Sequence, residues 1–221
     1  MRQLLLDLIP DTPPSLDNFV TGGNGEALTG LAGWLTPDSH ETSLLLWGEA
    51  GSGKTHLLHA SLSGSTGYCD AATDPDLSCC PGEAPLLAID HIEALSETGQ
   101  ITLFNHFNRQ RAAGRKLLTA ATAPPQQLAL REDLRTRLGS GLIYRLYPLT
   151  DEEKIAALKA QAAARGLRLP PDTLGYLLSR APRDMRSLTA LLVALDHYSL
   201  EQRRPITLPL LRDVLQTPLH F

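Results

Sequence analysis

A glycine-rich stretch followed by lysine and threonine is the part of this sequence with the clearest chemistry. Its eight residues follow the pattern G-x-x-x-x-G-K-T, and they are Gly48, Glu49, Ala50, Gly51, Ser52, Gly53, Lys54 and Thr55. Glycines allow backbone N–H groups to turn toward phosphate oxygens, and the helix N-terminus behind them adds a favourable dipole. Lys54 is expected to reach the terminal phosphates, while Thr55 offers its hydroxyl to Mg²⁺. The pattern therefore predicts a nucleotide-binding loop.

The residues on either side of this loop support the same interpretation. The apolar run at 44–47 indicates a buried strand, and residues 56–60 indicate a helix. A strand before the loop and a helix after it form the context in which phosphate-binding loops occur. The alternative is a glycine-rich turn that contains Gly-Lys-Thr by chance.

A second candidate site residue ends the apolar run that begins at Leu86. Asp90 is expected to bind Mg²⁺, directly or through water, across from Thr55. The next residue is His91, where hydrolases of this type usually have a second acidic residue that orients the attacking water. Glu93 follows two positions later and is expected to point elsewhere if the segment stays extended. Whether His91 is functional or a plain surface residue, the usual base is missing, and the sequence predicts weak hydrolysis by this protein alone.

Three polar side chains further along the chain are weaker candidates. Thr122 follows a predicted fourth strand and can place a polar group beside the phosphates, or it is a simple loop threonine. Arg137 ends a predicted helical segment, with Arg135 as a rival for any role. Arg186 opens a later helix, with Arg183 as its rival. On spacing alone, these arginines are typical of solvated helix surfaces.

The remaining pattern predicts alternating strands and helices, followed by helices alone. Strands are expected at 44–47, 67–70, 86–90, 116–121 and 142–146, and helices at 26–35, 56–60, about 96–113 and 124–138. A cap for the helix that ends near 113 is expected at Ser96 or Thr98. Further helices are expected at 151–164, 172–180, 182–200 and 208–215. Strands that alternate with helices predict an α/β fold with a doubly wound parallel sheet.

Composition narrows the possible functions. The 221 residues are 43% hydrophobic and 20% charged, as in an ordinary globular protein, with a net charge of −4. A nucleic-acid-binding surface usually shows a basic balance, so direct DNA binding is a minor hypothesis. No apolar run approaches the ~18 residues that a membrane span needs. The three cysteines, Cys69, Cys79 and Cys80, are odd in number and two are adjacent, which predicts no disulfide framework and a reducing cytoplasm.

Taken together, these motifs resemble an AAA+ ATPase module. The shared order is a phosphate loop, an Asp-ended strand, a polar residue after strand four, an arginine before strand five and a helical lid with an arginine. Residues 17–20 and 53–60 are similar to the nucleotide-binding segments of the bacterial replication initiator DnaA. Other segments resemble the Hda family, the regulatory inactivators of DnaA, and they are 89–93, 123–128, 147–154 and 183–186. The chain also leaves no room for the initiator's C-terminal DNA-binding domain, which favours Hda.

The resemblance implies a fold and a set of ligands. It implies an AAA+ P-loop fold with a five-stranded parallel sheet flanked by helices, plus a small C-terminal all-helical lid domain. The implied domains are a clamp-binding segment at 1–14, the AAA+ domain at 15–147 and the lid at 148–221. The implied cofactor is ADP or ATP with Mg²⁺. Thr55 and Asp90 would hold the metal, and Thr122 and Arg186 would join the loop around the nucleotide.

The N-terminus gains a meaning from the same resemblance. Its residues are similar to the family's clamp-binding motif Q-L-x-L-x-L, and the matching positions are Gln3, Leu4, Leu6 and Leu8. An extended peptide can place leucines in a hydrophobic pocket while a glutamine amide supplies directional hydrogen bonds. On its own the motif is equally typical of an amphipathic edge strand or a tail. Prolines that follow, at 10, 13 and 14, predict a first segment that stays extended and outside the core.

Function and partners are likewise implied by the resemblance. Arg137 would act in trans on ATP bound to DnaA, and the protein would prevent re-initiation of chromosomal replication. The partners would be DnaA and the DNA polymerase III sliding clamp (β subunit), with DNA reached indirectly through the clamp, no membrane, and a possible homo-oligomer. The expected location is the cytoplasm, with the nucleoid at replication forks. The alternatives are a self-sufficient AAA+ ATPase, such as a helicase loader or DnaA paralogue acting directly on DNA, and an adaptor that only binds clamp and nucleotide.

Overall fold

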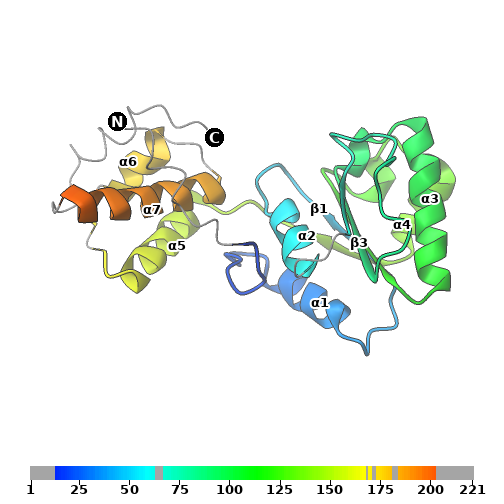
Figure 1. Cartoon of the computed structure of the whole chain (residues 1–221), viewed down its shortest axis with the longest axis horizontal. Helices are drawn as coiled ribbons and strands as arrows, with labels where there is room; N and C mark the ends of the chain where they lie inside the picture. The colour runs from blue at the N-terminus through cyan, green and yellow to red at the C-terminus, as the bar shows by residue number, and fades with distance from the viewer. Residues whose placement is uncertain (1–12, 63–66, 168, 171–172, 181–183, 203–221) are drawn as a thin grey trace. The chain divides into compact units, whose positions relative to one another are not determined.

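The computed structural model describes residues 13–62, 67–167, 169–170, 173–180 and 184–202 (Figure 1). The chain divides into two compact units, whose described parts are residues 13–148 and 149–202. The predicted clamp-binding residues 3–8 and the predicted helix at 208–215 lie outside the described residues.

A five-stranded parallel sheet forms the centre of the first unit. Its strands are β1 (Ser43–Trp47), β2 (Tyr68–Asp70), β3 (Leu86–Asp90), β4 (Lys116–Ala121) and β5 (Leu142–Arg145), in the order β2-β3-β4-β1-β5. The central strands are continuous apolar runs because helices cover both of their faces. Leu44, Leu45 and Leu46 of β1 are each no more than 1% exposed. The predicted α/β fold with five parallel strands is confirmed.

Two helices cover each face of the sheet (Figure 1). The helices are α1 (Gly25–Leu35) and α2 (Lys54–Leu62) on one face, and α3 (Glu97–Ala112) and α4 (Glu132–Gly139) on the other. Buried Leu31 and Leu57 belong to the first layer, and buried Leu103 and Leu134 to the second. The N-cap of α3 is Ser96, whose Oγ accepts a hydrogen bond from the Gly99 N–H at 3.0 Å.

One predicted helix is wrong in its extent. The segment from Pro124 to Leu138 was expected to be helical throughout, but it contains a short 3₁₀ helix, η2 (Pro125–Gln127), and then α4. Between them the backbone is extended at Leu128 and Arg131. The break has a packing reason, since Leu128 and Leu130 are both buried in the core beneath α3 and α4.

A single side chain links the start of α1 to the last residues of the first unit. The Asn24 Nδ2 atom donates to the Tyr147 carbonyl at 2.9 Å, and the Tyr147 N–H donates to Asn24 Oδ1 at 2.8 Å. Asn24 precedes α1 and is 3% exposed. Its amide therefore satisfies both backbone groups of a residue 123 positions away.

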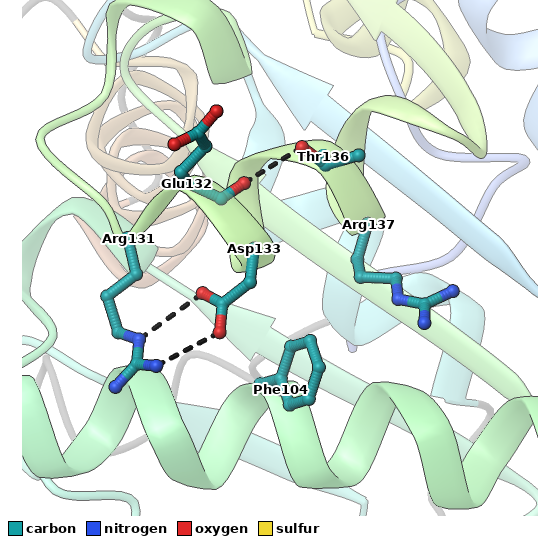
Figure 2. Close-up of a pocket in the computed structure, with 6 residues that line it drawn as sticks. All are labelled: Phe104, Arg131, Glu132, Asp133, Thr136 and Arg137. Atoms are coloured by element: carbon teal, nitrogen blue, oxygen red, sulfur yellow. Dashed lines mark hydrogen bonds and ion pairs between the residues drawn. The ribbon is translucent and has the colours of Figure 1, made fainter.

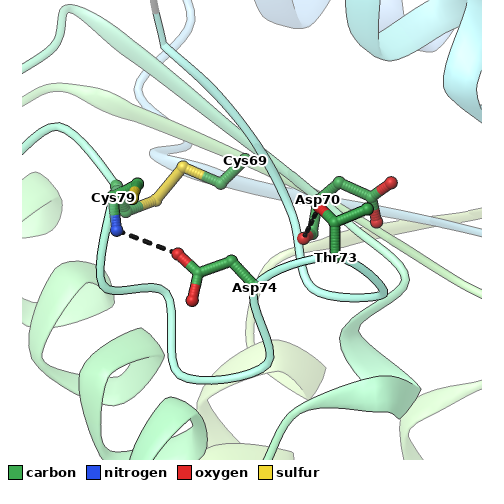
Figure 3. The surroundings of a disulfide bond; sticks show 6 residues. Cys69, Asp70, Thr73, Asp74 and Cys79 are labelled. Atoms are coloured by element: carbon green, nitrogen blue, oxygen red, sulfur yellow. Dashed lines mark hydrogen bonds between the residues drawn. A yellow bond between two sulfur atoms is a disulfide. The ribbon is translucent and has the colours of Figure 1, made fainter.

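The expectation that the cysteines form no disulfide framework was wrong, because Cys69 and Cys80 form a disulfide with a Cα–Cα distance of 5.8 Å (Figure 3). Counting cysteines could not show that the residues after β2 turn back on themselves. Turn hydrogen bonds, such as Thr73 N–H to Asp70 O at 3.1 Å, fold this loop. The turns return Cys80 to the strand that contains Cys69. Cys79 remains an exposed free thiol.

The described part of the second unit contains three helices, α5 (Asp151–Ala164), α6 (Thr173–Arg180) and α7 (Met185–Gln202). Thr150 and Glu153 form the predicted capping box at the start of α5, which is confirmed. The core of the unit is built almost wholly from leucine, and its fully buried members include Leu158, Leu177, Leu188, Leu192 and Leu195. Within the described part of the chain, no helix has the length and apolarity that a bilayer crossing requires.

Candidate nucleotide-binding site

The predicted phosphate loop connects the end of β1 to the start of α2. Two of its glycines are required by their surroundings. A Cβ atom at Gly48 would lie 2.1 Å from the Leu146 carbonyl oxygen, which no side chain could tolerate. Gly53 has a φ of +95°, and a Cβ there would lie 2.6 Å from the Phe19 ring. The backbone can therefore approach neighbouring groups closely only because these positions are glycine.

Lys54 is buried inside the loop and bonded to it. Its Nζ donates to the carbonyl oxygens of Gly48 at 2.7 Å and Glu49 at 2.9 Å. Burial lowers the pKa of Lys54, and it outweighs the attraction of Asp90 and Glu93, which acts in the opposite direction. The lysine is therefore held at the loop by carbonyl groups that a phosphate could replace.

Thr55 and Asp90 meet as the sequence predicted. The Thr55 hydroxyl donates to Asp90 Oδ2 at 2.6 Å, although the two residues come from different elements. The Tyr68 hydroxyl donates to the same oxygen at 3.3 Å, and the His91 N–H donates to Oδ1 at 2.9 Å. Asp90 itself is fully buried. A buried carboxylate beside a hydroxyl supplies the oxygen ligands that Mg²⁺ prefers.

A buried hydroxyl without a hydrogen-bond partner is a further reason why the loop fits a nucleotide. Among the described residues, Ser52 Oγ is one of four buried side-chain polar atoms without a hydrogen-bond partner. Ser52 is 4% exposed and lies within the loop. No cluster of three or more His, Cys, Asp or Glu that could hold a metal occurs in the described part. Phosphate oxygens and water would therefore complete a Mg²⁺ shell here, as is usual for this ion.

His91 is not a plain surface residue. Its backbone is left-handed, with φ of 52°, and its Nδ1 lies 2.9 Å from Asp70 Oδ1. Burial favours the neutral ring, but the hydrogen bond to Asp70 and the charges of Asp90, Asp70 and Glu93 prevail, so the pKa of His91 is raised. Asp70 was not singled out from the sequence. Its position at the end of a predicted strand, like that of Asp90, was the available signal.

The backbone after His91 does not stay extended. It turns into a 3₁₀ helix, η1 (Ile92–Ala94), which carries Glu93 back toward the sheet. Glu93 Oε2 then accepts a hydrogen bond from the Thr122 N–H at 3.3 Å. Thr122 is therefore placed beside the acidic segment at the end of β4, and its own side chain is exposed.

The chain before α1 contacts the phosphate loop, and its residues 17–20 are those that the sequence analysis found similar to a nucleotide-binding segment of DnaA. Phe19 packs against Gly53 and lies 5.6 Å from the His56 ring, measured between centroids. His56 Nε2 is 3.0 Å from the Ser15 carbonyl oxygen. Leu16 and Phe19 also pack against the core, so this segment is not outside it as the prolines suggested.

Arg137 lies away from the phosphate loop, in an open hollow between α3 and α4 (Figure 2). The hollow, called the α3–α4 hollow below, is lined by Phe104, Arg131, Glu132, Asp133, Thr136 and Arg137. The guanidinium carbon of Arg137 is 6.0 Å from the centre of the Phe104 ring. Figure 2 shows Phe104 between Arg137 and the ion pair of Arg131 with Asp133, whose closest contact is 3.0 Å. Within the described residues, no carboxylate forms an ion pair with Arg137.

The other predicted arginine belongs to the second unit. Arg186 is exposed in the first turn of α7. The structure therefore brings the phosphate loop, Thr55, Asp90 and Thr122 to one edge of the sheet. Arg137 belongs to a different surface of the same unit, and Arg186 to a different unit.

Comparisons with known proteins agree with this architecture. Residues 151–215 match the family model described as the Hda lid domain. The fold is similar to domain III of the Thermotoga maritima replication initiation protein DnaA, with a TM-score of 0.69, 21% identity, and coverage of 94% of this chain and 98% of that one. AMPPCP-bound DnaA from Aquifex aeolicus gives a TM-score of 0.65 at 23% identity, covering 89% and 71%. The RuvB Holliday junction branch migration motor of Thermotoga maritima gives 0.66 at 19%, covering 92% and 72%.

These matches confirm the predicted class. The α/β unit has the AAA+ fold, and the helices that follow it correspond to a lid. The chain therefore has the fold of DnaA domain III and carries a segment that matches the lid domain of Hda.

Proposed function

We propose that this protein regulates the initiation of chromosomal replication by promoting hydrolysis of the ATP bound to DnaA. The observation that carries the proposal is the match of residues 151–215 to the Hda lid domain, on a module whose fold is that of DnaA domain III. A replication-related AAA+ protein with this lid type, rather than a general ATPase, is the function that the combination favours.

In this proposal the phosphate loop binds ADP or ATP with Mg²⁺. Phosphate oxygens replace the two carbonyl groups that now bind Lys54, and they supply a partner for Ser52 Oγ. Thr55 and Asp90 hold the metal, and Thr122 and Arg186 contact the nucleotide. DnaA from Aquifex aeolicus binds the analogue AMPPCP on a similar fold, which supports nucleotide binding by this chain. The nucleotide orders the module and is turned over slowly.

The arginine that acts on DnaA is Arg137. Its guanidinium has no carboxylate partner among the described residues, and it lies in an open hollow rather than in its own phosphate loop. A head-to-tail contact between AAA+ modules would bring it to the ATP of DnaA. There it would stabilise the charge that develops on the transferred phosphoryl group.

The sliding clamp would hold the protein at DNA that is being replicated. Gln3, Leu4, Leu6 and Leu8 would bind in the hydrophobic pocket of the clamp as an extended peptide. Tethering of this kind raises the local concentration of the module near DnaA, so a weak contact between the two modules is enough.

The test is the hydrolysis of radiolabelled ATP bound to DnaA, measured with and without this protein and with and without clamp loaded on DNA. Rapid hydrolysis only in the complete mixture is the expected result, and no stimulation would contradict the proposal. Replacing Gln3 and Leu6 with alanine should abolish clamp binding and stimulation together. Leu5→Ala, at a position between the motif residues, is the matched control and should retain both.

A second candidate is a self-sufficient ATPase that acts directly on DNA. The observation in its favour is the pairing of His91 with Asp70, because it orients an imidazole beside the buried Asp90. Rapid turnover of ATP by the purified protein without DnaA would support this candidate. Loss of that turnover in Lys54→Ala would assign it to the phosphate loop rather than to a contaminant.

A further inference from the structure

All three residues of strand β2 are engaged at or beside the nucleotide site. Tyr68 donates its hydroxyl to Asp90, and Asp70 lies 2.9 Å from the His91 ring nitrogen. Cys69, between them, forms the disulfide with Cys80. The disulfide is therefore formed by Cys69, whose two neighbours in β2 each contact a residue of the candidate Mg²⁺-binding segment, Asp90 or His91.

Strand β2 depends on that link more than the other strands do. It is three residues long, it lies at the edge of the sheet and it pairs with β3. A short edge strand with one neighbour has few backbone hydrogen bonds to hold its position. The disulfide supplies an additional attachment to the loop at 71–85.

The loop at the other end of the disulfide is itself fixed to α3. The Ser96 N–H donates to the Pro75 carbonyl at 3.1 Å, and the Ser96 hydroxyl also donates to Asp76. A Cβ atom at Gly99 would lie 1.9 Å from the same carbonyl oxygen, so the loop and helix pack closely. Figure 3 shows Asp74 of this loop accepting a hydrogen bond from the Cys79 N–H. The disulfide thus joins the edge strand to a loop that a core helix anchors.

We propose that the Cys69–Cys80 disulfide is a redox-controlled latch on the nucleotide site. With the bond formed, β2 holds Tyr68 against Asp90 and Asp70 against His91. With the bond reduced, β2 keeps its pairing with β3 and the stacking of Tyr68 on His59, but it loses its covalent attachment to the loop at 71–85. The carboxylate that would bind Mg²⁺ then has neighbours that are held less firmly. Binding of the nucleotide with Mg²⁺ then weakens. This inference rests on the proposed nucleotide site.

The reduction can proceed by ordinary thiol–disulfide exchange. Cys80 is half-buried while Cys69 is 8% exposed, so a dithiol reductant reaches the Cys80 sulfur first. A thiolate of the reductant attacks Cys80 Sγ and breaks the bond to Cys69. Cys69 leaves as a thiolate and takes up a proton. The second thiol of the reductant then displaces Cys80. The reductant gives up two electrons and becomes a disulfide, and both cysteines become thiols.

The test compares binding of fluorescent N-methylanthraniloyl-ADP with Mg²⁺ by the oxidised and the dithiothreitol-reduced protein. Thiols counted in denaturant should be one before reduction and three after it. We expect reduction to weaken the affinity by about five- to tenfold, within the range of coupling between linked sites. The Asp70→Asn variant should bind weakly in both states and lose its response to reduction.

Variants of the cysteines separate the latch from general effects of reductant. Cys80→Ser, at the half-buried position, should bind like reduced protein whether or not reductant is present. Cys79→Ser, next to it, should keep the full response. Three thiols in protein treated with oxidant, or equal affinities in the two redox states, would overturn the latch alone. Absence of nucleotide binding in both states would overturn the proposed nucleotide site and the latch with it.

Discussion

The phosphate loop and the α3–α4 hollow belong to the same unit, yet they treat their charged groups in opposite ways. In the loop, Lys54 is bonded to two carbonyl groups, and Asp90 accepts hydrogen bonds from Thr55, Tyr68 and the His91 backbone. In the hollow, Arg137 lies over the Phe104 ring, and the acidic residue nearest to it in sequence is already paired with Arg131.

The difference indicates how each region meets an anion. A ligand that enters the loop must exchange partners with groups that are already bonded, so binding and local rearrangement are coupled. Among the described residues, the arginine in the hollow forms no ion pair, and an aromatic face holds a guanidinium without using its N–H groups, so these donors can meet an external anion. The loop is therefore suited to retain a ligand, and the hollow to present a charge to another molecule.

The largest expected effect comes from a substitution that alters the α3–α4 hollow and leaves the phosphate loop intact. Arg137→Ala should lower the stimulated hydrolysis of DnaA-bound ATP by about 10³-fold or more, because an arginine supplied in trans is worth roughly 10³–10⁵ in rate. The affinity of the Arg137→Ala variant for ADP should equal that of the unaltered protein. Arg135→Ala is the matched control from the same helix, and a comparable loss in that variant would assign the role to the other arginine.

The next largest effect comes from a substitution that alters the phosphate loop and leaves the α3–α4 hollow intact. Lys54→Ala should weaken ADP binding by about a hundredfold, since truncation of a buried, hydrogen-bonded charge costs roughly 2–5 kcal/mol. Isothermal titration calorimetry measures the affinity directly. Lys159→Ala, at an exposed lysine of α5, is the control. Unchanged affinity in Lys54→Ala would show that the loop does not bind phosphate.

A smaller change should separate the metal from the nucleotide within the loop. Asp90→Asn keeps the shape of the side chain and removes its charge, so the affinity for ADP should fall by at least about tenfold in the presence of Mg²⁺. In EDTA the variant and the unaltered protein should bind alike. Asp38→Asn, at an exposed carboxylate, is the control, and an equal loss with and without Mg²⁺ would contradict a metal role.

The smallest expected effect concerns the helix that supports the hollow. Ser96→Ala removes the N-cap of α3 and should lower the free energy of unfolding by about 1 kcal/mol. Urea denaturation measures the change, and Thr98→Ala, at an exposed position in the first turn, should be close to neutral. Activity of both regions should persist, because neither Arg137 nor Lys54 contacts the cap. A stability equal to that of Thr98→Ala would show that the cap contributes nothing.

The part of the site that follows from local pattern was predictable. The spacing of the glycines and Lys54 fixes a loop between strand and helix, and carboxyl ends of parallel strands meet at one edge. For that reason the meeting of Thr55 with Asp90 could be expected before any coordinates existed. The five strands were also predictable, because continuous apolar runs bounded by polar residues are typical of buried parallel strands.

The parts that failed depend on the path of irregular segments. The pairing of Cys69 with Cys80 requires a loop to return to its own strand, and no count of cysteines contains that path. Phe19 reaches Gly53 across 34 positions for the same reason. The contact of His91 with Asp70 needs a left-handed residue after β3, which neither propensity nor periodicity indicates. In each case the deciding contact joins segments that the local pattern treats separately.

The amide of Asn24 has a consequence for how this architecture could be rebuilt. By bonding both backbone groups of Tyr147, it holds the start of α1, the first helix of the sheet unit, beside the last residues of that unit. Adjacent termini are the condition under which a unit tolerates circular permutation or insertion into another chain. Whatever follows Pro148 could thus be exchanged for a different appendage while the sheet keeps its closure. The helical unit could therefore be exchanged without changing the fold of the sheet unit.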